Sequence, residues 1–127
     1  MVRYDPSQPF GSASAWTTFV LTNVAAGNDG MYGMTFDGRY LYFVPSNSPQ
    51  LGLEGLFARY DTTLPFTAAS SWESYDLTAV SPVATGLGSA VFDGQNVYLV
   101  PFFSGAVVRF AAKSPSGLPA GYGASFY

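Results

Sequence analysis

The sequence predicts an all-β fold assembled from a repeated unit. Three observations predict it: short motifs recur at one fixed spacing, the apolar segments are short and separated by Gly, Pro, Asn and Asp, and Asp-Gly pairs join neighbouring apolar segments. Short apolar and aromatic segments bounded by such residues are typical of strands, and an Asp-Gly pair between two of them indicates a β-hairpin. We therefore expect one all-β domain over residues 1–127.

The spacing of the repeat is 56 residues, as Arg3-Tyr4-Asp5 and Arg59-Tyr60-Asp61 illustrate. The same spacing relates Pro9-Phe10 to Pro65-Phe66, Trp16 to Trp72, Phe36-Asp37-Gly38 to Phe92-Asp93-Gly94, and Tyr42, Val44 and Pro45 to Tyr98, Val100 and Pro101. A third Arg-aromatic segment, at residues 107–110, comes only 50 residues after the second, so its preceding loop is six residues shorter. A period of this length is a signature of repeat architectures.

Each unit has room for four strands, which in the central copy are expected at residues 33–36, 40–44, 56–61 and 72–77. The segment at residues 40–44, YLYFV, is apolar or aromatic at every position. A strand with one face in water would alternate apolar with polar residues, so both faces of this strand must be covered. We therefore expect each unit to be a propeller-type blade that packs between the sheets on either side.

The chain holds about two and a half such blades, with a partial blade at residues 1–22, a full blade at 31–78, a partial blade at 87–110 and a C-terminal strand at 121–127. Closed propellers have about 4 to 8 four-stranded blades. Open strand edges favour pairing with another chain. We therefore expect oligomerisation to complete the ring, with a homodimer favoured because its two sets of ten strands would make five blades.

A family resemblance adds to this prediction. The string FDGRYLYFVP followed by ARYDT, PF and SW resembles the blade repeat of a group of mostly uncharacterised bacterial and phage-associated β-propeller proteins, and the tail KSPSGLPAGYGASF looks like their usual ending. The resemblance covers nearly the whole chain and implies a propeller, but it carries over no catalytic or binding residues. Full-length relatives carry more repeats, so the chain could be a fragment or a self-assembling short form.

Composition excludes several classes of function. The chain has no Cys and no His, which excludes disulfides, a cysteine nucleophile, a Cys/His zinc site and a Ser-His-Asp triad. Its net charge is -3 and only five residues are basic, so we expect no nucleic-acid partner and no binding to an anionic membrane. No apolar segment has transmembrane length, and the N-terminus lacks the pattern of a signal peptide. We expect a soluble protein without a cofactor or a metal site.

The repeated polar residues are interpreted as parts of the scaffold. Asp5, Asp37, Asp61 and Asp93 occur where strands end or turn, where Asp bonds neighbouring backbone groups. The repeated arginines are expected to pair with acidic residues across strands. Trp16 and Trp72, which could also stack on sugars, are expected to pack in the core.

Residues outside the repeat are better candidates for binding, because the scaffold does not require them. The connections expected on the ligand-binding face of a propeller are residues 23–32, 46–54, 78–88 and 102–104. Candidate contact residues in these connections are Asn28, Asp29, Asn47, Gln50, Glu54, Phe102 and Phe103. The adjacent Phe102 and Phe103 either expose at least one ring or both fold back onto the blade. Around Asn28 and Asp29 the spacing of a calcium loop is missing, so a plain turn is expected there.

Two classes of function fit these observations. The favoured hypothesis is a non-enzymatic module that binds a glycan or a protein through its loop face. The alternative is a structural unit whose role is self-assembly, and a further alternative is that the chain is a fragment of a larger propeller. An enzyme is disfavoured because the acids outside the repeat are few: Asp29, Glu54, Glu73 and Asp76.

Overall fold

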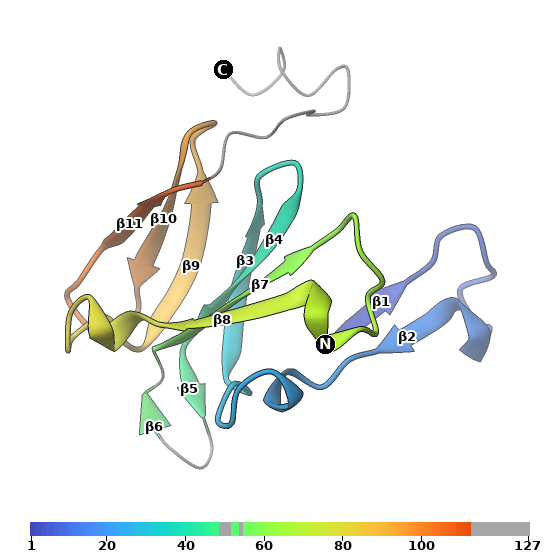
Figure 1. Ribbon diagram of the computed structural model, residues 1–127, viewed down its shortest axis with the longest axis horizontal. Helices are drawn as coiled ribbons and strands as arrows, with labels where there is room; N and C mark the ends of the chain where they lie inside the picture. Colours follow the sequence, from blue (N-terminus) through green and yellow to red (C-terminus); the bar gives the residue numbers. More distant parts are fainter. Residues whose placement is uncertain (49–51, 54, 113–127) are drawn as a thin grey trace.

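The computed structural model describes residues 1–48, 52–53 and 55–112, and it is all-β with no α-helix among these residues (Figure 1). The strands of the described residues form four antiparallel sheets, with two, four, two and three strands in chain order. The all-β prediction is confirmed. No sheet in the described part of the chain closes on itself, and a propeller ring is not seen there.

The four-stranded sheet is a simple antiparallel meander. It runs through β3 (Met31–Phe36), β4 (Tyr40–Pro45), β7 (Leu56–Asp61) and β8 (Trp72–Asp76), in that spatial order. These are the four strands that the sequence predicts for the central unit. The fourth ends at Asp76 instead of Leu77, because Leu77 begins a 3-10 helix, η4 (Leu77–Ala79).

The two flanking sheets repeat parts of this meander. At the N-terminus β1 (Val2–Tyr4) pairs with β2 (Trp16–Thr18), the counterparts of β7 and β8. On the other side β9 (Leu87–Phe92), β10 (Asn96–Pro101) and β11 (Val108–Ala111) form a three-stranded sheet. The strand expected at residues 121–127 lies outside the described residues.

Several short elements were not expected from the sequence. The loop after β4 contains a small hairpin of β5 (Asn47–Ser48) and β6 (Gly52–Leu53). Short 3-10 helices precede or follow the outer strands: η1 (Ala13–Ala15), η2 (Leu21–Asn23) and η3 (Ala69–Ser71), in addition to η4. Each is one turn long, which is too short to produce a helical periodicity in the sequence.

The turn between β3 and β4 differs in one respect from the prediction. Of the Asp37-Gly38 pair, only Gly38 has a positive φ, of 99°. Asp37 is buried, and its carboxylate accepts hydrogen bonds from the backbone N–H of Arg39 at 2.8 Å, from that of Tyr40 at 2.7 Å and from the Tyr42 hydroxyl at 2.7 Å. Glycine is therefore required here by backbone geometry, and aspartate by hydrogen bonding.

The sheets follow one another in space (Figure 1), and buried side chains form two hydrophobic cores between them. One core, between the N-terminal segment and the four-stranded sheet, includes Phe19, Phe43 and Trp72. The other, between the four-stranded and three-stranded sheets, includes Tyr42 and Leu99. Alternate residues of β4 enter the two cores, so this strand is covered on both faces, as its continuous apolar sequence predicts.

The first strands of two neighbouring sheets, β3 and β9, approach each other closely. A Cβ atom on Gly33 of β3 would lie 3.0 Å from the Gly88 carbonyl oxygen and 3.1 Å from the Ser89 Cα atom, both in β9. These positions are backbone atoms, which cannot give way as a flexible side chain can. Glycine at position 33 thus permits the contact between the two sheets.

Candidate functional site

Three exposed aromatic side chains lie together beside the ends of β3 and β10. Phe102 and Phe103 follow β10 directly, and both rings are exposed. Their ring centroids are 4.6 Å apart in an edge-to-face arrangement, and the ring of Tyr32 in β3 is stacked on Phe102 with centroids 5.8 Å apart. We call Tyr32, Phe102 and Phe103 the loop-face cluster. Of the two alternatives open for the Phe pair, the structure shows exposed rings.

The backbone beneath the loop-face cluster is held by hydrogen bonds. The N–H groups of Phe102 and Phe103 both donate to the Gly86 carbonyl oxygen, at 3.0 and 2.9 Å. A Cβ atom on Gly88 would lie 2.9 Å from the Phe102 Cβ atom, so a larger residue there would displace the ring. The aromatic side chains are thus presented on a fixed backbone. Contiguous exposed aromatic surface of this kind is typical of contact sites.

The other candidate residues differ in their exposure. Asp29 and Asn47 are exposed, and Gln50 and Glu54 lie outside the described residues. Asn28 is only 1% exposed, its side-chain amide donates to the Ser74 hydroxyl at 3.3 Å, and its Oδ1 atom has no partner among the described residues. Such burial is more typical of a structural side chain than of a surface contact.

Tyr32 was not among the residues singled out from the sequence. The sequence did contain a signal for Tyr32. The equivalent position 56 residues later is Gly88, so the aromatic ring at position 32 is not part of the repeat. What the sequence could not indicate is that β3 and β9 lie side by side. This proximity brings Tyr32 to Phe102, 70 residues further along the chain.

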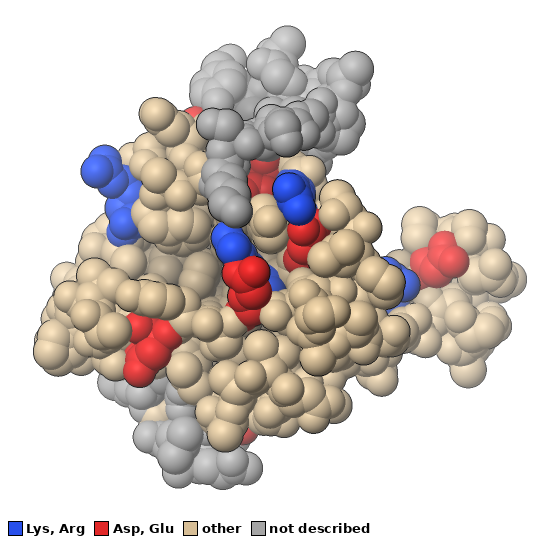
Figure 2. Space-filling model, in the orientation of Figure 1, with Lys and Arg blue, Asp and Glu red and all other residues tan. Residues whose placement is uncertain are grey.

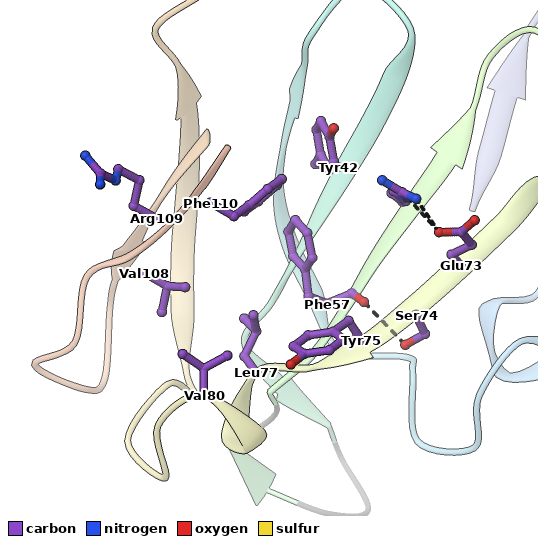
Figure 3. Close-up of a pocket in the computed structure, with 11 residues that line it drawn as sticks. Tyr42, Phe57, Glu73, Ser74, Tyr75, Leu77, Val80, Val108, Arg109 and Phe110 are labelled. Atoms are coloured by element: carbon purple, nitrogen blue, oxygen red, sulfur yellow. Dashed lines mark hydrogen bonds and ion pairs between the residues drawn. The ribbon is translucent and has the colours of Figure 1, made fainter. Parts of the chain in front are cut away.

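A separate pocket of about 360 Å³ lies between the four-stranded sheet and β11 (Figure 3). Its apolar wall is formed by side chains from both sheets and from η4 with the residue after it: Tyr42, Phe57, Tyr75, Leu77, Val80, Val108 and Phe110. Arg59 and Glu73 also line the pocket and are joined by hydrogen bonds of 2.8 and 2.5 Å. The side chain of Arg109 points away from the pocket (Figure 3). The pocket therefore offers an apolar, aromatic lining beside an ion pair whose charges neutralise each other.

The chemistry of this pocket favours burial of an apolar group over acid–base catalysis. The Glu73 carboxylate forms an ion pair with Arg59, whose guanidinium also lies over the Tyr40 ring, 4.5 Å from its centroid. Burial, together with the hydrogen bond to Asp37, raises the pKa of the Tyr42 hydroxyl above its ordinary value, so Tyr42 stays protonated near neutral pH. Among the described residues, the other titratable side chains that line the pocket are Tyr75 and Arg109.

The repeated aspartates lie in turns, as their positions in the sequence predict. Each of their carboxylates accepts a hydrogen bond from the backbone N–H of the residue two positions later, as the carboxylate of Asp76, outside the repeat, also does; the four repeated residues are Asp5, Asp37, Asp61 and Asp93. The hydrogen bond from the Arg39 guanidinium, followed by bonds from Thr63, lowers the pKa of Asp61 well below its usual range. Among the described residues no group of three or more acidic side chains could hold a metal ion. These carboxylates stabilise turns and strand ends.

Charged groups are sparse on the face of the molecule shown in Figure 2 and are scattered over it. No helix in the described part of the chain is long and apolar enough to cross a membrane. Comparisons with family models, curated proteins and solved structures found no match to this chain.

Proposed function

We propose that this chain is a non-enzymatic module of β-propeller type that binds a glycan or a protein through the loop-face cluster. The observation that carries the proposal is the contact of three exposed rings, Tyr32, Phe102 and Phe103, on a hydrogen-bonded backbone. Aromatic faces contact the apolar C–H surface of sugars and the side chains of protein partners with little loss of conformational entropy. Phe102 and Phe103 are outside the repeat, so their exposure is not a requirement of the scaffold.

The arrangement of the sheets supports a propeller type of architecture. A four-stranded antiparallel meander is the blade of such proteins. Here the four-stranded sheet packs on both faces, and its first strand, β3, lies against β9, the first strand of the next sheet. The sheets on either side both reproduce part of the same meander.

The proposal is tested by binding of the labelled full chain to a glycan array and to candidate protein ligands. The Phe102→Ser, Phe103→Ser double variant should retain the thermal stability of the parent to within about 0.5 kcal/mol, since both side chains are exposed. It should bind at least ~10-fold more weakly, because buried aromatic anchors dominate binding energies.

A matched control is Leu64→Ser, which removes another exposed apolar side chain. Leu64 lies in the connection between β7 and β8, outside the loop-face cluster. This variant should bind like the parent. A fall in folded yield of the double variant, without weaker binding by the protein that survives, would assign the two rings to the core and overturn the proposal.

A second candidate function, structural self-assembly, is favoured by a different observation. In the described part of the chain, the sheet of β1 and β2 has two strands, and that of β9, β10 and β11 has three, where the central sheet has four. Strand edges left open in this way favour pairing with another chain. Light scattering on an eluting peak tests this function: twice the chain mass of 13.5 kDa would support a closed dimer, and a monomer at all concentrations would contradict it.

A further inference from the structure

The molecule contains two copies of one aromatic arrangement. The N-terminal triad consists of Tyr4, Phe10 and Trp16, and the central triad consists of Tyr60, Phe66 and Trp72. In the N-terminal triad the Tyr–Trp and Phe–Trp centroid distances are 4.9 and 5.1 Å, and in the central triad they are 4.7 and 5.4 Å. In both triads the Trp indole N–H donates to the Phe carbonyl oxygen at 2.9 Å. The two triads are therefore structurally equivalent.

The central triad is covered by three identifiable groups. Phe19 is stacked on Trp72 with ring centroids 4.6 Å apart and an interplanar angle of 4°. Phe43, from the neighbouring strand β4, lies with its centroid 5.4 Å from that of Trp72. The guanidinium of Arg3 lies over the Phe66 ring at 4.9 Å. Together these contacts leave Trp72 and Phe66 only 3% and 6% exposed.

The N-terminal triad lacks such a cover in the described part of the chain. Trp16 is 39% exposed and Phe10 is 70% exposed. The strand that would lie beside β1, as β4 lies beside β7, is also missing among the described residues, since β1 pairs only with β2 there. The hairpin thus presents an apolar face and an adjacent strand edge that are both occupied in its structural copy.

Asp5, beside the N-terminal triad, also differs from its counterpart in the central unit. In the central unit Asp61 accepts two hydrogen bonds from the Arg39 guanidinium, at 3.1 and 2.7 Å, and Arg39 lies in the turn of the β3–β4 hairpin. Its counterpart Asp5 accepts bonds from the Ser7 backbone and hydroxyl, as Asp61 does from Thr63. Among the described residues no arginine forms an ion pair with Asp5. Asp5 therefore has the local geometry of Asp61 without its basic partner.

We propose that the β1 edge, Asp5 and the N-terminal triad form a docking surface for a second β-hairpin with the chemistry of β3–β4. Such a hairpin would pair along β1, place a phenyl ring against Trp16 and bring an arginine to Asp5. This is recognition by strand addition, in which backbone hydrogen bonds supply affinity and side-chain pockets supply specificity. The inference rests on the proposed repeat architecture, because it takes the central unit as the template for the partner.

The polar groups of this surface favour a peptide hairpin over a glycan. The Trp16 indole N–H and the Tyr4 hydroxyl already donate to the carbonyl oxygens of Phe10 and Gln8. Neither donor is free to bond a sugar hydroxyl, whereas the open edge of β1 requires backbone partners. Two bonds of the template would be lost, because the N–H and the hydroxyl of Thr62 both donate to the Arg39 carbonyl oxygen, and the equivalent residue, Pro6, has neither donor.

The test uses a synthetic peptide of residues 31–45, capped at both ends and flanked by lysines for solubility, added to the full chain. Binding is followed by calorimetry and by tryptophan fluorescence. We expect saturable binding with a blue shift as Trp16 is covered, at least ~10-fold weaker binding by the Trp16→Ala chain, and weaker binding of the peptide carrying Arg39→Ala. Asp5→Asn in the chain and Arg39→Ala in the peptide should be non-additive, because they remove the same contact.

The Phe102→Ser, Phe103→Ser chain should bind the peptide as the parent does, so failure of the loop-face proposal and failure of this one can be told apart. Equal affinity of the parent and Trp16→Ala chains, or no saturable binding, would overturn the docking surface. A glycan that protects Trp16 from iodide quenching while the peptide does not would also overturn it.

Discussion

The N-terminal triad and the central triad have nearly the same internal geometry, yet one is exposed and the other buried. The Trp indole bond, the Tyr hydroxyl bond to the residue four positions later and the Asp turn are present in both. All three bonds form within a segment of 14 residues, from Arg3 to Trp16 or from Arg59 to Trp72. The comparison teaches that this segment makes its local structure by itself, whereas its burial depends on neighbouring strands.

The comparison is tested most strongly by removing each tryptophan. Trp72→Ala should lower the free energy of unfolding by about 3 to 5 kcal/mol, because it opens a cavity in a packed core. Trp16→Ala should cost below about 1 kcal/mol in the isolated chain, because its ring is partly in water. Urea denaturation of both variants measures the difference. Equal losses would show that the N-terminal triad is covered in solution, and would break the comparison.

A second test concerns the turn of the β3–β4 hairpin, which packs beside β7 and has no counterpart beside β1 among the described residues. Asp37→Ala should cost about 2 kcal/mol, because it leaves the buried Tyr42 hydroxyl and the Tyr40 N–H without their acceptor. Gly38→Val should cost roughly 1 kcal/mol or more, because valine disfavours its φ of 99°. Thermal melts measure both effects. Asp93→Ala, in the exposed equivalent turn, is the control and should lose less stability; a parent-like melt of Gly38→Val would contradict the turn geometry.

The smallest change in stability is expected when the pH is lowered. The pKa of Asp61 is lower in the folded chain than the value of about 3.9 in an unfolded one, so its contribution to stability is complete above about pH 4 and is lost as the pH falls toward the folded pKa. Asp61→Asn should therefore reduce the loss of stability between pH 5 and pH 2, measured by urea denaturation at each pH.

Asp5→Asn sharpens the same comparison. The pKa of Asp5 is also lowered, through hydrogen bonds from Ser7 and to a smaller extent by the charge of Arg3, but without the Arg39 bonds that Asp61 accepts. Its substitution should change the acid sensitivity less than Asp61→Asn does. An equal change would mean that the turn bonds, and not the arginine, determine the pH dependence.

The sequence by itself determined the all-β class, the positions of the main strands and the sites of the turns. These follow from local causes: β4 is apolar at every position, and glycine tolerates the positive φ of the turns at Gly38 and Gly94. The tertiary structure decided which copy of a repeated motif is buried, that Tyr32 meets Phe102, that Asn28 is enclosed, and that a pocket lies beside β11. The motifs around Trp16 and Trp72 are alike, so the sequence cannot show that Trp16 is exposed and Trp72 buried. Burial depends on residues far away in the chain, and only the packing of one sheet on the next brings those residues together.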